Sequence, residues 1–294
     1  MTGNILIFGS SQQDGYYLKK QLNDFNLFSF KSQKHPGGVD VRNQDDIKSI
    51  LLKYRPSYII NLAAISETNC DLFQEVYSTI YDGNKNILNT LYQEEIDCKY
   101  VSASSAYIYE SNESLITLNS RYRYDNPYSL ARINALNCIR YFSSKGVNTL
   151  CAHLFHHESK YRSPSSLIFK VAEDMIAIAK TRKPNKLYVN NKDVIKEWTH
   201  ASDSMNALCM LMLNHSPCEV NIASGIGLSL YEIVRIFADI LGIQPPSLNS
   251  TATSSSPIRY VGDPKEIYDF GWRPKVCVNE LCSEVIDHLK TNPC

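Results

Sequence analysis

The hydrophobic positions in the first half of the chain form short continuous runs that alternate with longer amphipathic stretches. Runs such as ILIF (5–8) and YIINLA (58–63) are typical of parallel strands buried on both faces. The stretches between them repeat apolar residues at helical spacing. The pattern predicts strands at 4–8, 27–30, 57–63, 100–104 and 147–154, and helices at 16–25, 44–54, 78–95 and 128–144. Alternating strands and helices indicate an α/β fold with a Rossmann-like, doubly wound parallel sheet.

The pattern loosens after about residue 155. Ser229, followed three residues later by Glu232, predicts a capping box at the start of one helix. The stretch NSTATSSSP (249–257) predicts a polar loop. The remaining pattern predicts helices at 166–181, 201–213, 230–241, 264–269 and 278–289. We therefore expect a larger domain at 1–155 and a smaller C-terminal lobe at 156–294, and we leave open whether the chain crosses between them.

Composition narrows the functional classes. Thirty basic residues balance thirty acidic ones, so the net charge gives no support to nucleic-acid or membrane binding. No apolar run reaches the length of about 18 residues that a membrane-spanning helix needs. The N-terminus lacks the features of a signal peptide. The nine cysteines are scattered without a CxxC pair, which indicates free thiols in a reducing cytoplasm.

The first strand runs into a turn that has the outline of a phosphate-binding loop, GSSQQDGYYL (9–18). Gly9 follows the strand and Gly15 opens a helix, so helix N–H groups and the helix dipole can face a pyrophosphate. Gln12 occupies the place of the usual middle glycine. Its side chain either crowds a cofactor or turns outward and donates an amide hydrogen bond. From the turn alone, a strand–turn–helix without a ligand is an equal alternative.

Two residues near the second strand bear on the cofactor. Asp40 stands where an acid that contacts adenine would fit. The second strand ends at Phe30 and Lys31 without an acid, and a basic residue there suits the 2′-phosphate of NADP better than the ribose of NAD. We therefore expect NADP, with NAD as the alternative.

Serines at the end of a buried strand, YVSASSAYIYE (100–110), and the stretch NPYSLAR (126–132) suggest redox chemistry. Tyr128 and Arg132 are four residues apart and share a helical face. A nearby cation stabilises a phenolate, which can then take a proton from a sugar hydroxyl while hydride leaves for a nicotinamide. Tyrosine and arginine at this spacing are otherwise usually a surface pair.

Five stretches, in the right order and over nearly the whole chain, resemble the GDP-mannose 4,6-dehydratase family of the extended short-chain dehydrogenase/reductase superfamily. The first, GSSQQDGYYL, is similar to GITGQDGSYL of the family, and IINLAAIS (59–66) to IYNLAAQS. LFHHES (154–159) is similar to LFNHES. LYVNNKDVIKEWTHASD (187–203) is similar to LYLGNLDAKRDWGHAKD, and VGDPKEIYDFGWRPKV (261–276) to LGDPSKAKEKLGWKPKV. The resemblance implies a cofactor domain at 1–155 and a sugar-nucleotide lobe at 156–294.

The resemblance also assigns site residues, with departures at the chemical step. The family's catalytic Thr falls at Ser105, its Tyr at Tyr128 and its Lys at Arg132. The family's Glu, which removes the C5 proton during elimination, falls at Tyr107. We expect the cofactor contacts to be Gly9, Gln12, Gln13, Asp14, Gly15, Lys31, Asp40, Leu62, Ala63, Ala64, Tyr128 and Arg132.

For the substrate, the resemblance implies a GDP-mannose-like nucleotide sugar bound in the cleft to the C-terminal lobe. The residues expected to contact it are Ser66, His156, Glu158, Arg162, Lys170, Lys196 and Arg259. The alternative for the lysines and arginines among them is that they are solvated surface charges. Consecutive residues of a strand point to opposite faces, so His156, His157 and Glu158 are not expected to bind a metal.

Three functions remain open. The first is a nucleotide-sugar 4,6-dehydratase, which lacks its elimination base at Tyr107. The second is a reductase or epimerase of a nucleotide-linked keto sugar, which needs no acid there. The third is a catalytically impaired homologue that binds a sugar nucleotide. The resemblance further implies a homodimer or homotetramer.

Overall fold

The computed structural model describes residues 3–66, 70–181, 186–189, 191–250 and 258–292. The chain divides into two compact units, and it passes between them more than once. Unit 1 consists of Met1–Glu110, Thr117–Leu154 and Met205–Ile222. Unit 2 consists of Ser111–Ile116, Phe155–Ser204 and Ala223–Cys294.

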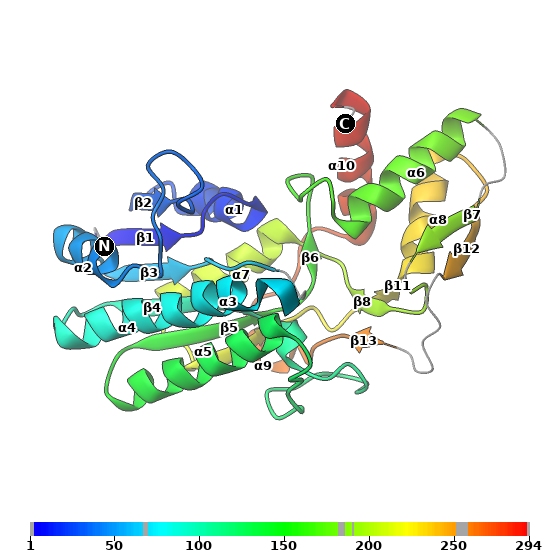
Figure 1. Ribbon diagram of the computed structural model, residues 1–294. Coiled ribbons are helices and arrows are strands. Elements are labelled where there is room, and N and C mark those ends of the chain that lie inside the picture. The colour runs from blue at the N-terminus through cyan, green and yellow to red at the C-terminus, as the bar shows by residue number, and fades with distance from the viewer. Residues whose placement is uncertain (1–2, 67–69, 182–185, 190, 251–257, 293–294) are drawn as a thin grey trace. The chain divides into compact units, whose positions relative to one another are not determined.

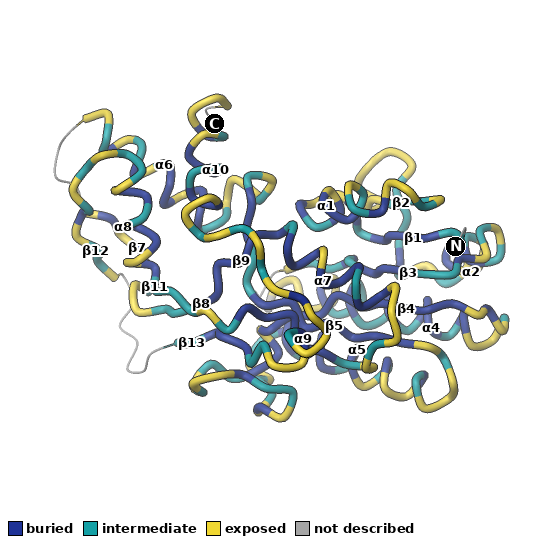
Figure 2. Tube along the Cα trace, turned by 180° about the vertical axis from the view of Figure 1, so that it is seen from behind, coloured by how far each residue is buried: buried dark blue, intermediate teal, exposed yellow. Residues whose placement is uncertain are grey.

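Unit 1 is built on a six-stranded parallel sheet of order β10-β5-β4-β3-β1-β2 (Figure 1). The strands are β1 (Asn4–Phe8), β2 (Asn26–Phe30), β3 (Tyr58–Asn61), β4 (Lys99–Ser105), β5 (Thr149–Leu154) and β10 (Glu219–Ile222). Every residue of β4 and β5 is buried, and the tube in Figure 2 is dark blue along both. The predicted α/β class with a doubly wound parallel sheet is confirmed.

The helices of unit 1 connect these strands. They are α1 (Gln13–Gln21), α2 (Gln44–Tyr54), α3 (Phe73–Tyr77), α4 (Gly83–Gln93), α5 (Pro127–Ser144) and most of α7 (Ala201–Leu213), with short helical turns η1 (Cys70–Leu72), η2 (Ser78–Asp82) and η3 (Ala106–Ile108). Helices α2, α4 and α5 pack side by side along one face of the sheet (Figure 1). The Lys99 ammonium at the start of β4 donates to the carbonyls of Leu211 and Asn214, which caps the C-terminal end of α7.

Local chemistry explains where the key helices begin. Asn43 caps α2 by accepting from the N–H groups of Asp45 and Asp46. Asn126 caps α5 in the same way, and Pro127 follows at the first helical position. Because α5 starts at this capped turn, Tyr128 lies in its first turn.

Three expectations for unit 1 differ from the structure. The helix predicted at 16–25 begins at Gln13, directly after the turn. The helix predicted at 78–95 is preceded by α3 and interrupted by the π-helical turn η2. The sixth strand, β10, was not predicted, because four residues give too short a pattern to separate from a loop.

Unit 2 packs helices α6 (Leu167–Thr181), α8 (Leu230–Leu241) and α10 (Val278–Thr291) around a shared apolar core. The predicted capping box of Ser229 and Glu232 is present at the start of α8. Small sheets complete the unit: β11-β8-β13, β12-β7 and β6-β9. Their bounds are β6 (His157–Glu158), β7 (Lys186–Val189), β8 (Ile195–Glu197), β9 (Thr199–His200), β11 (Gly227–Ser229), β12 (Ser247–Ser250) and β13 (Arg259–Tyr260), followed by helix α9 (Lys265–Asp269). None of these strands was predicted, and most of the loop expected at 249–257 lies outside the described residues.

Within the described ranges, no helix has both the length and the apolar character needed to cross a bilayer.

Candidate functional site

The turn after β1 has the close approaches that a phosphate-binding loop needs. Gly9 has φ +80°, and a Cβ there would come within 2.6 Å of the backbone N of Ala63. A Cβ at Gly15 would come within 2.4 Å of the carbonyl oxygen of Ser10. The Ser10 Oγ is buried and has no hydrogen-bond partner among the described residues. Two obligatory glycines and one buried polar atom fit a pyrophosphate cradle at the start of α1.

Gln12 stands at this turn in the place of the usual middle glycine. Its backbone is extended, with φ −104° and ψ −176°, and it stands at the N-cap position of α1. The residue is exposed, and its side chain makes no capping hydrogen bond. The next residue, Gln13, is buried in the first turn, and Asp14 follows it there. Both roles predicted for Gln12 therefore stay predictions.

The carboxylate of Asp40 is paired. Its two oxygens accept from Arg42 in a bidentate arrangement, with Nε to Oδ1 at 2.8 Å and Nη2 to Oδ2 at 2.8 Å. The Arg42 hydrogen bonds hold the pKa of Asp40 below its ordinary value, so the group is ionised. Lys31 is exposed, and its carbonyl accepts from the Val39 N–H, which brings it close to Asp40 in the chain's path. Arg42, which the sequence analysis missed, is the partner that engages this carboxylate.

The segment after β3 lies beside the phosphate turn. The Leu62 N–H donates to Phe8, and the Ala63 N–H donates to the side chain of Asn61; Ala64 follows them. A buried polar network holds this corner. The Asn61 amide donates to the Tyr100 hydroxyl at 3.0 Å, and that hydroxyl donates to the Asn84 side chain at 2.6 Å. The network was not foreseen, because asparagines on separate elements give no periodic signal.

The expected catalytic side chains of unit 1 meet where β4 ends and α5 begins. Ser105 is the last residue of β4, and its Oγ accepts from the Tyr107 N–H at 3.2 Å. Because that contact uses a lone pair, the Ser105 proton stays available for an oxygen atom of a ligand. The Tyr107 side chain is 42% exposed. No carboxylate stands at this position.

Tyr128 and Arg132 lie on one face of α5, as their spacing requires. The guanidinium carbon of Arg132 is 5.2 Å from the centre of the Tyr128 ring, within cation–π range. Both residues are buried, and Tyr128 packs against Val76 and Ile80. The Nη1 of Arg132 donates to the carbonyl of Ala103 on β4. We call Ser105, Tyr107, Tyr128 and Arg132 the β4–α5 site.

Unit 2 gathers four of the expected substrate-contacting residues into one group, which we call the charged cluster: His156, Glu158, Arg162 and Lys196. Glu158 and Lys196 are buried, whereas Arg162 is partly exposed. The Glu158 Oε1 lies 2.7 Å from the His156 Nε2, and its Oε2 forms an ion pair with the Arg162 Nε at 3.2 Å. The Lys196 Nζ lies 2.7 Å from the His156 Nε2 and 4.3 Å from the centre of the Trp198 ring.

Burial controls the charges of this cluster. Burial, aided by the Lys196 charge, lowers the pKa of His156 to about 4, so the imidazole is neutral at neutral pH. Burial acts to raise the pKa of Glu158, but its neighbours hold it at about 2. Burial also lowers the pKa of Lys196 to about 8. Two cations and one carboxylate leave the cluster with net positive charge, which favours an anion such as a diphosphate.

The remaining expected substrate residues are Ser66, Lys170 and Arg259. Ser66 is exposed in unit 1. Lys170 is exposed on α6. The Nε of Arg259 donates to the Ser114 carbonyl at 2.7 Å, on strand β13 beside the strand of Lys196.

Glu197, next to Lys196, was not singled out from the sequence. It is fully buried and accepts from the N–H groups of Ser224, Gly225 and Gly262 and from the Ser224 hydroxyl. Burial raises its pKa to about 7, although these donors act in the opposite direction. Because its donors are mostly backbone groups, Glu197 fixes the loops of unit 2 around β8.

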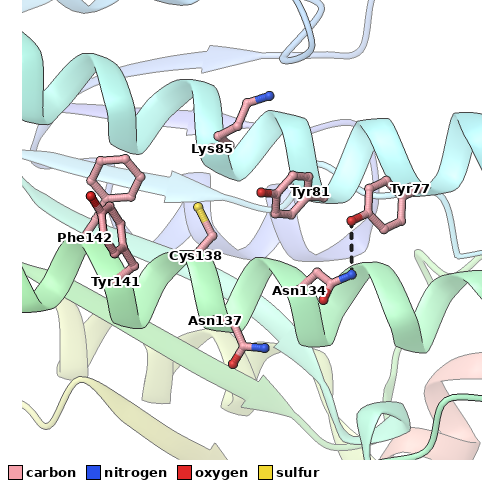
Figure 3. Close-up of a pocket in the computed structure, with 8 residues that line it drawn as sticks. All are labelled: Tyr77, Tyr81, Lys85, Asn134, Asn137, Cys138, Tyr141 and Phe142. Carbon is pink, nitrogen blue, oxygen red and sulfur yellow. Dashed lines mark hydrogen bonds between the residues drawn. The ribbon is translucent and has the colours of Figure 1, made fainter.

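A separate groove of about 450 Å³ lies along α5 on the side of η2 and α4 (Figure 3). Tyr77, Tyr81 and Lys85 line one wall, and α5 provides the rest of the lining, including Cys138 and Tyr141. None of the residues predicted for catalysis or ligand binding lines it.

Comparisons with known proteins bear on the family and the fold. The sequence profile of the family described as GDP-mannose 4,6 dehydratase matches residues 26–285. A GDP-mannose 4,6-dehydratase of Vibrio cholerae is 23% identical over 285 residues, which cover 84% of this chain and 76% of the relative.

Two solved structures share the fold. The structure of RMD from Pseudomonas aeruginosa complexed with NADPH has a TM-score of 0.84 at 19% identity, with 99% of this chain and 98% of that chain covered. The dTDP-glucose 4,6-dehydratase from Bacillus anthracis in complex with NAD has a TM-score of 0.83 at 19% identity, with 99% and 97% covered. At these identities the likeness shows a shared fold; the first structure holds NADPH and the second holds NAD.

Proposed function

Because the chain belongs to the GDP-mannose 4,6-dehydratase family, we propose that it converts GDP-mannose, or a close relative, to the 4-keto-6-deoxy nucleotide sugar with loss of one water. The observation that carries this proposal is the β4–α5 site. It places a hydroxyl with an available proton, Ser105, on the segment that adjoins the helix of the tyrosine–cation pair of Tyr128 and Arg132.

The residues of the β4–α5 site have distinct roles in this proposal. Tyr128, as phenolate, takes the proton of the sugar 4-hydroxyl as C4 is oxidised. Ser105 donates a hydrogen bond to the same oxygen and holds it in place. The guanidinium of Arg132 lies beside the Tyr128 ring and ties this part of α5 to β4 through the Ala103 carbonyl.

NADP is the cofactor that we propose, held by the turn at Gly9–Gly15, Asp40 and Leu62–Ala64. Bound there, it supplies the hydride acceptor for C4 and the hydride donor for C6. The solved relatives carry NADPH in one case and NAD in another, so they support a nicotinamide cofactor without selecting one. Lys31 favours NADP, since an exposed cation there can pair with a 2′-phosphate.

The nucleotide sugar is proposed to contact the residues predicted from the sequence: Ser66, His156, Glu158, Arg162, Lys170, Lys196 and Arg259. Within the charged cluster, Lys196 and Arg162 are the groups suited to a diphosphate. Glu158 is occupied by its neighbours, so its role is to hold Arg162 and His156 rather than to bind the anion itself.

Tyr107 supports the alternative of a reductase or epimerase. A protonated phenol is a poor base for the C5 proton. A reductase or epimerase of a nucleotide-linked keto sugar requires only the redox step and leaves Tyr107 without a role in elimination. The impaired-homologue alternative rests on the commitment of the Arg132 Nη1 to Ala103, which is unlike a ribose contact.

One assay separates these functions. Purified protein is incubated with NADP and GDP-mannose, and the product is examined by mass spectrometry for the loss of one water and by carbonyl trapping for the 4-keto group. A dehydrated keto product supports the dehydratase. Oxidation of NADPH with a GDP-4-keto-6-deoxyhexose, without any reaction of GDP-mannose, supports the reductase. NADP binding without either reaction supports the impaired homologue, and no cofactor binding contradicts all enzyme readings.

We also propose a homo-oligomer, formed through the groove face of α4 and α5 (Figure 3). Two aromatic side chains are exposed on these helices, Tyr141 at 57% and Tyr92 at 49%. Light scattering on the native protein and on a Tyr141→Glu variant tests this face, because a charge there should dissociate the assembly. A cytoplasmic location is proposed from the cysteines, since the seven whose side chains are described are free thiols.

A further inference from the structure

Two side chains of α5 donate to the segment that carries Ser105. Ser129 and Arg132 are three residues apart and therefore lie on one face of the helix. The Ser129 Oγ donates to the Tyr107 carbonyl at 3.0 Å. The Arg132 Nη1 donates to the Ala103 carbonyl. The two carbonyls lie two residues before and two residues after Ser105.

The peptide of Tyr107 is held from both sides. Its N–H donates to the Ser105 Oγ at 3.2 Å, and its carbonyl accepts from Ser129. The backbone of Tyr107 therefore links Ser105, the candidate hydrogen-bond donor on β4, to Ser129 on α5. Ser129 is the residue that follows Tyr128. This connection passes through backbone atoms, so it does not depend on which side chain position 107 carries.

The Ser129 hydroxyl has a fixed orientation. It accepts from the Asn126 Nδ2 at 2.9 Å, while the Ser129 N–H donates to the Asn126 Oδ1 at 3.0 Å. Ser129 is fully buried. With its lone pair and N–H engaged by the helix cap, its proton is directed to the Tyr107 carbonyl, and no rotation to another partner is needed.

We propose that Ser129 is a positioning residue for the redox step: it sets the position of the Ser105 hydroxyl relative to Tyr128 by holding the backbone of Tyr107. The proposal rests on the proposed function for its kinetic consequence, and it adds a residue that the family resemblance did not indicate. Arg132 holds the other side of Ser105 through Ala103, so the strand end is fixed at two points.

The consequence for the reaction is geometric. Ser105 and Tyr128 must reach the same sugar oxygen, and hydride transfer is sensitive to errors of about 1 Å in such an arrangement. Without the Ser129 hydroxyl, the Tyr107 carbonyl loses its hydrogen bond from α5, and the turn can shift toward another partner. Ser105 moves with the turn, because its Oγ is bonded to the same residue.

The test compares Ser129→Ala with Ser144→Ala. Ser144 is a matched control, since its Oγ also donates to a backbone carbonyl on α5, that of Tyr141 at 2.7 Å, but at the exposed far end of the helix. We expect Ser129→Ala to lower kcat about tenfold or more, with the Kd for NADPH and the KM for the nucleotide sugar within about twofold of the native values. Ser144→Ala should leave all three unchanged. An unchanged kcat, or an equal loss of rate and cofactor affinity, would overturn the proposal.

A second readout separates this proposal from the function on which it rests. Crystal structures of the native protein and Ser129→Ala with NADP show whether the Tyr107 carbonyl and Ser105 Oγ move relative to Tyr128. If the native protein does not react with any nucleotide sugar, the proposed function fails, and the displacement alone decides the positioning role. Superimposable turns in the two structures would rule that role out, whatever the activity.

Discussion

The β4–α5 site and the charged cluster are held together by different kinds of interaction. The first uses hydroxyls and backbone groups at the end of a parallel strand, and its single cation, Arg132, is bound to a backbone carbonyl. The second uses ionisable side chains that hold one another, with Glu158 between His156 and Arg162. Directional neutral hydrogen bonds fix the place of a reacting atom, whereas buried charges fix an electrostatic potential. Mutations in the two regions should therefore change different observables.

The largest effect is expected at Tyr128. Tyr128→Phe removes the group that takes the proton and leaves the ring against Val76 and Ile80. We expect kcat to fall by about a thousandfold, with NADPH affinity unchanged, because general acid–base groups contribute about 10² to 10⁴ in rate. Steady-state kinetics and a fluorescence titration measure the two quantities. Retention of more than about a tenth of the activity would assign the proton transfer to another group.

A mutation in the charged cluster should change the stability of the fold more than the rate of the reaction. Glu158→Gln leaves Arg162 and Lys196 without their buried carboxylate, and we expect a loss of about 3–5 kcal/mol in the free energy of unfolding. Denaturant unfolding of the cofactor-free protein measures it. The control is Glu94→Gln, which breaks a surface pair with Lys48 of 2.7 Å and should cost at most about 1 kcal/mol. Equal losses for the two variants would show that the cluster does not depend on Glu158.

The pH dependence sharpens the comparison. Lys196, with a pKa of about 8, loses its charge as pH rises, so we expect the Kd for GDP-mannose to increase about tenfold from about pH 7 to about pH 9. Lys196→Arg keeps the charge and should abolish this dependence. Folding stability, in contrast to the affinity for GDP-mannose, should increase with pH. The folded pKa lies below the ordinary value of 10.5, so the unfolded chain binds more protons between the two values and stability rises with pH there. A flat Kd in the native protein would exclude Lys196 from the diphosphate contact.

The smallest effect is expected at the phosphate turn. Gln12 is exposed, and its extended backbone suits any residue. Gln12→Gly should therefore change the Kd for NADPH by no more than about threefold, about 0.7 kcal/mol, as followed by nicotinamide fluorescence. A gain of tenfold or more in affinity would mean that the glutamine crowds the cofactor.

Much of unit 1 could be predicted from the sequence because its buried parallel strands are continuous apolar runs, and helical spacing correctly put Tyr128 and Arg132 on one face. Helical spacing tells which residues share one face of a helix but not what that face contacts. The contact of Arg132 with Ala103 could therefore not be foreseen. The pairing of Asp40 with Arg42 depends on a turn, and a sequence pattern does not record it. In unit 2, strands of two to four residues carry no period, and only the family resemblance grouped His156, Glu158 and Lys196.

The late return of the chain to unit 1 has a consequence for biosynthesis. Strand β5 is buried at every position, and β10, which pairs with it, ends only at Ile222, after the chain has passed through much of unit 2. During translation, residues 149–154 therefore emerge as an open, apolar sheet edge, and their partner strand is synthesised several seconds later at about 5–20 residues per second. A fragment that ends near residue 155 would keep this edge permanently and should aggregate, although it contains Ser105, Tyr128 and the whole phosphate turn.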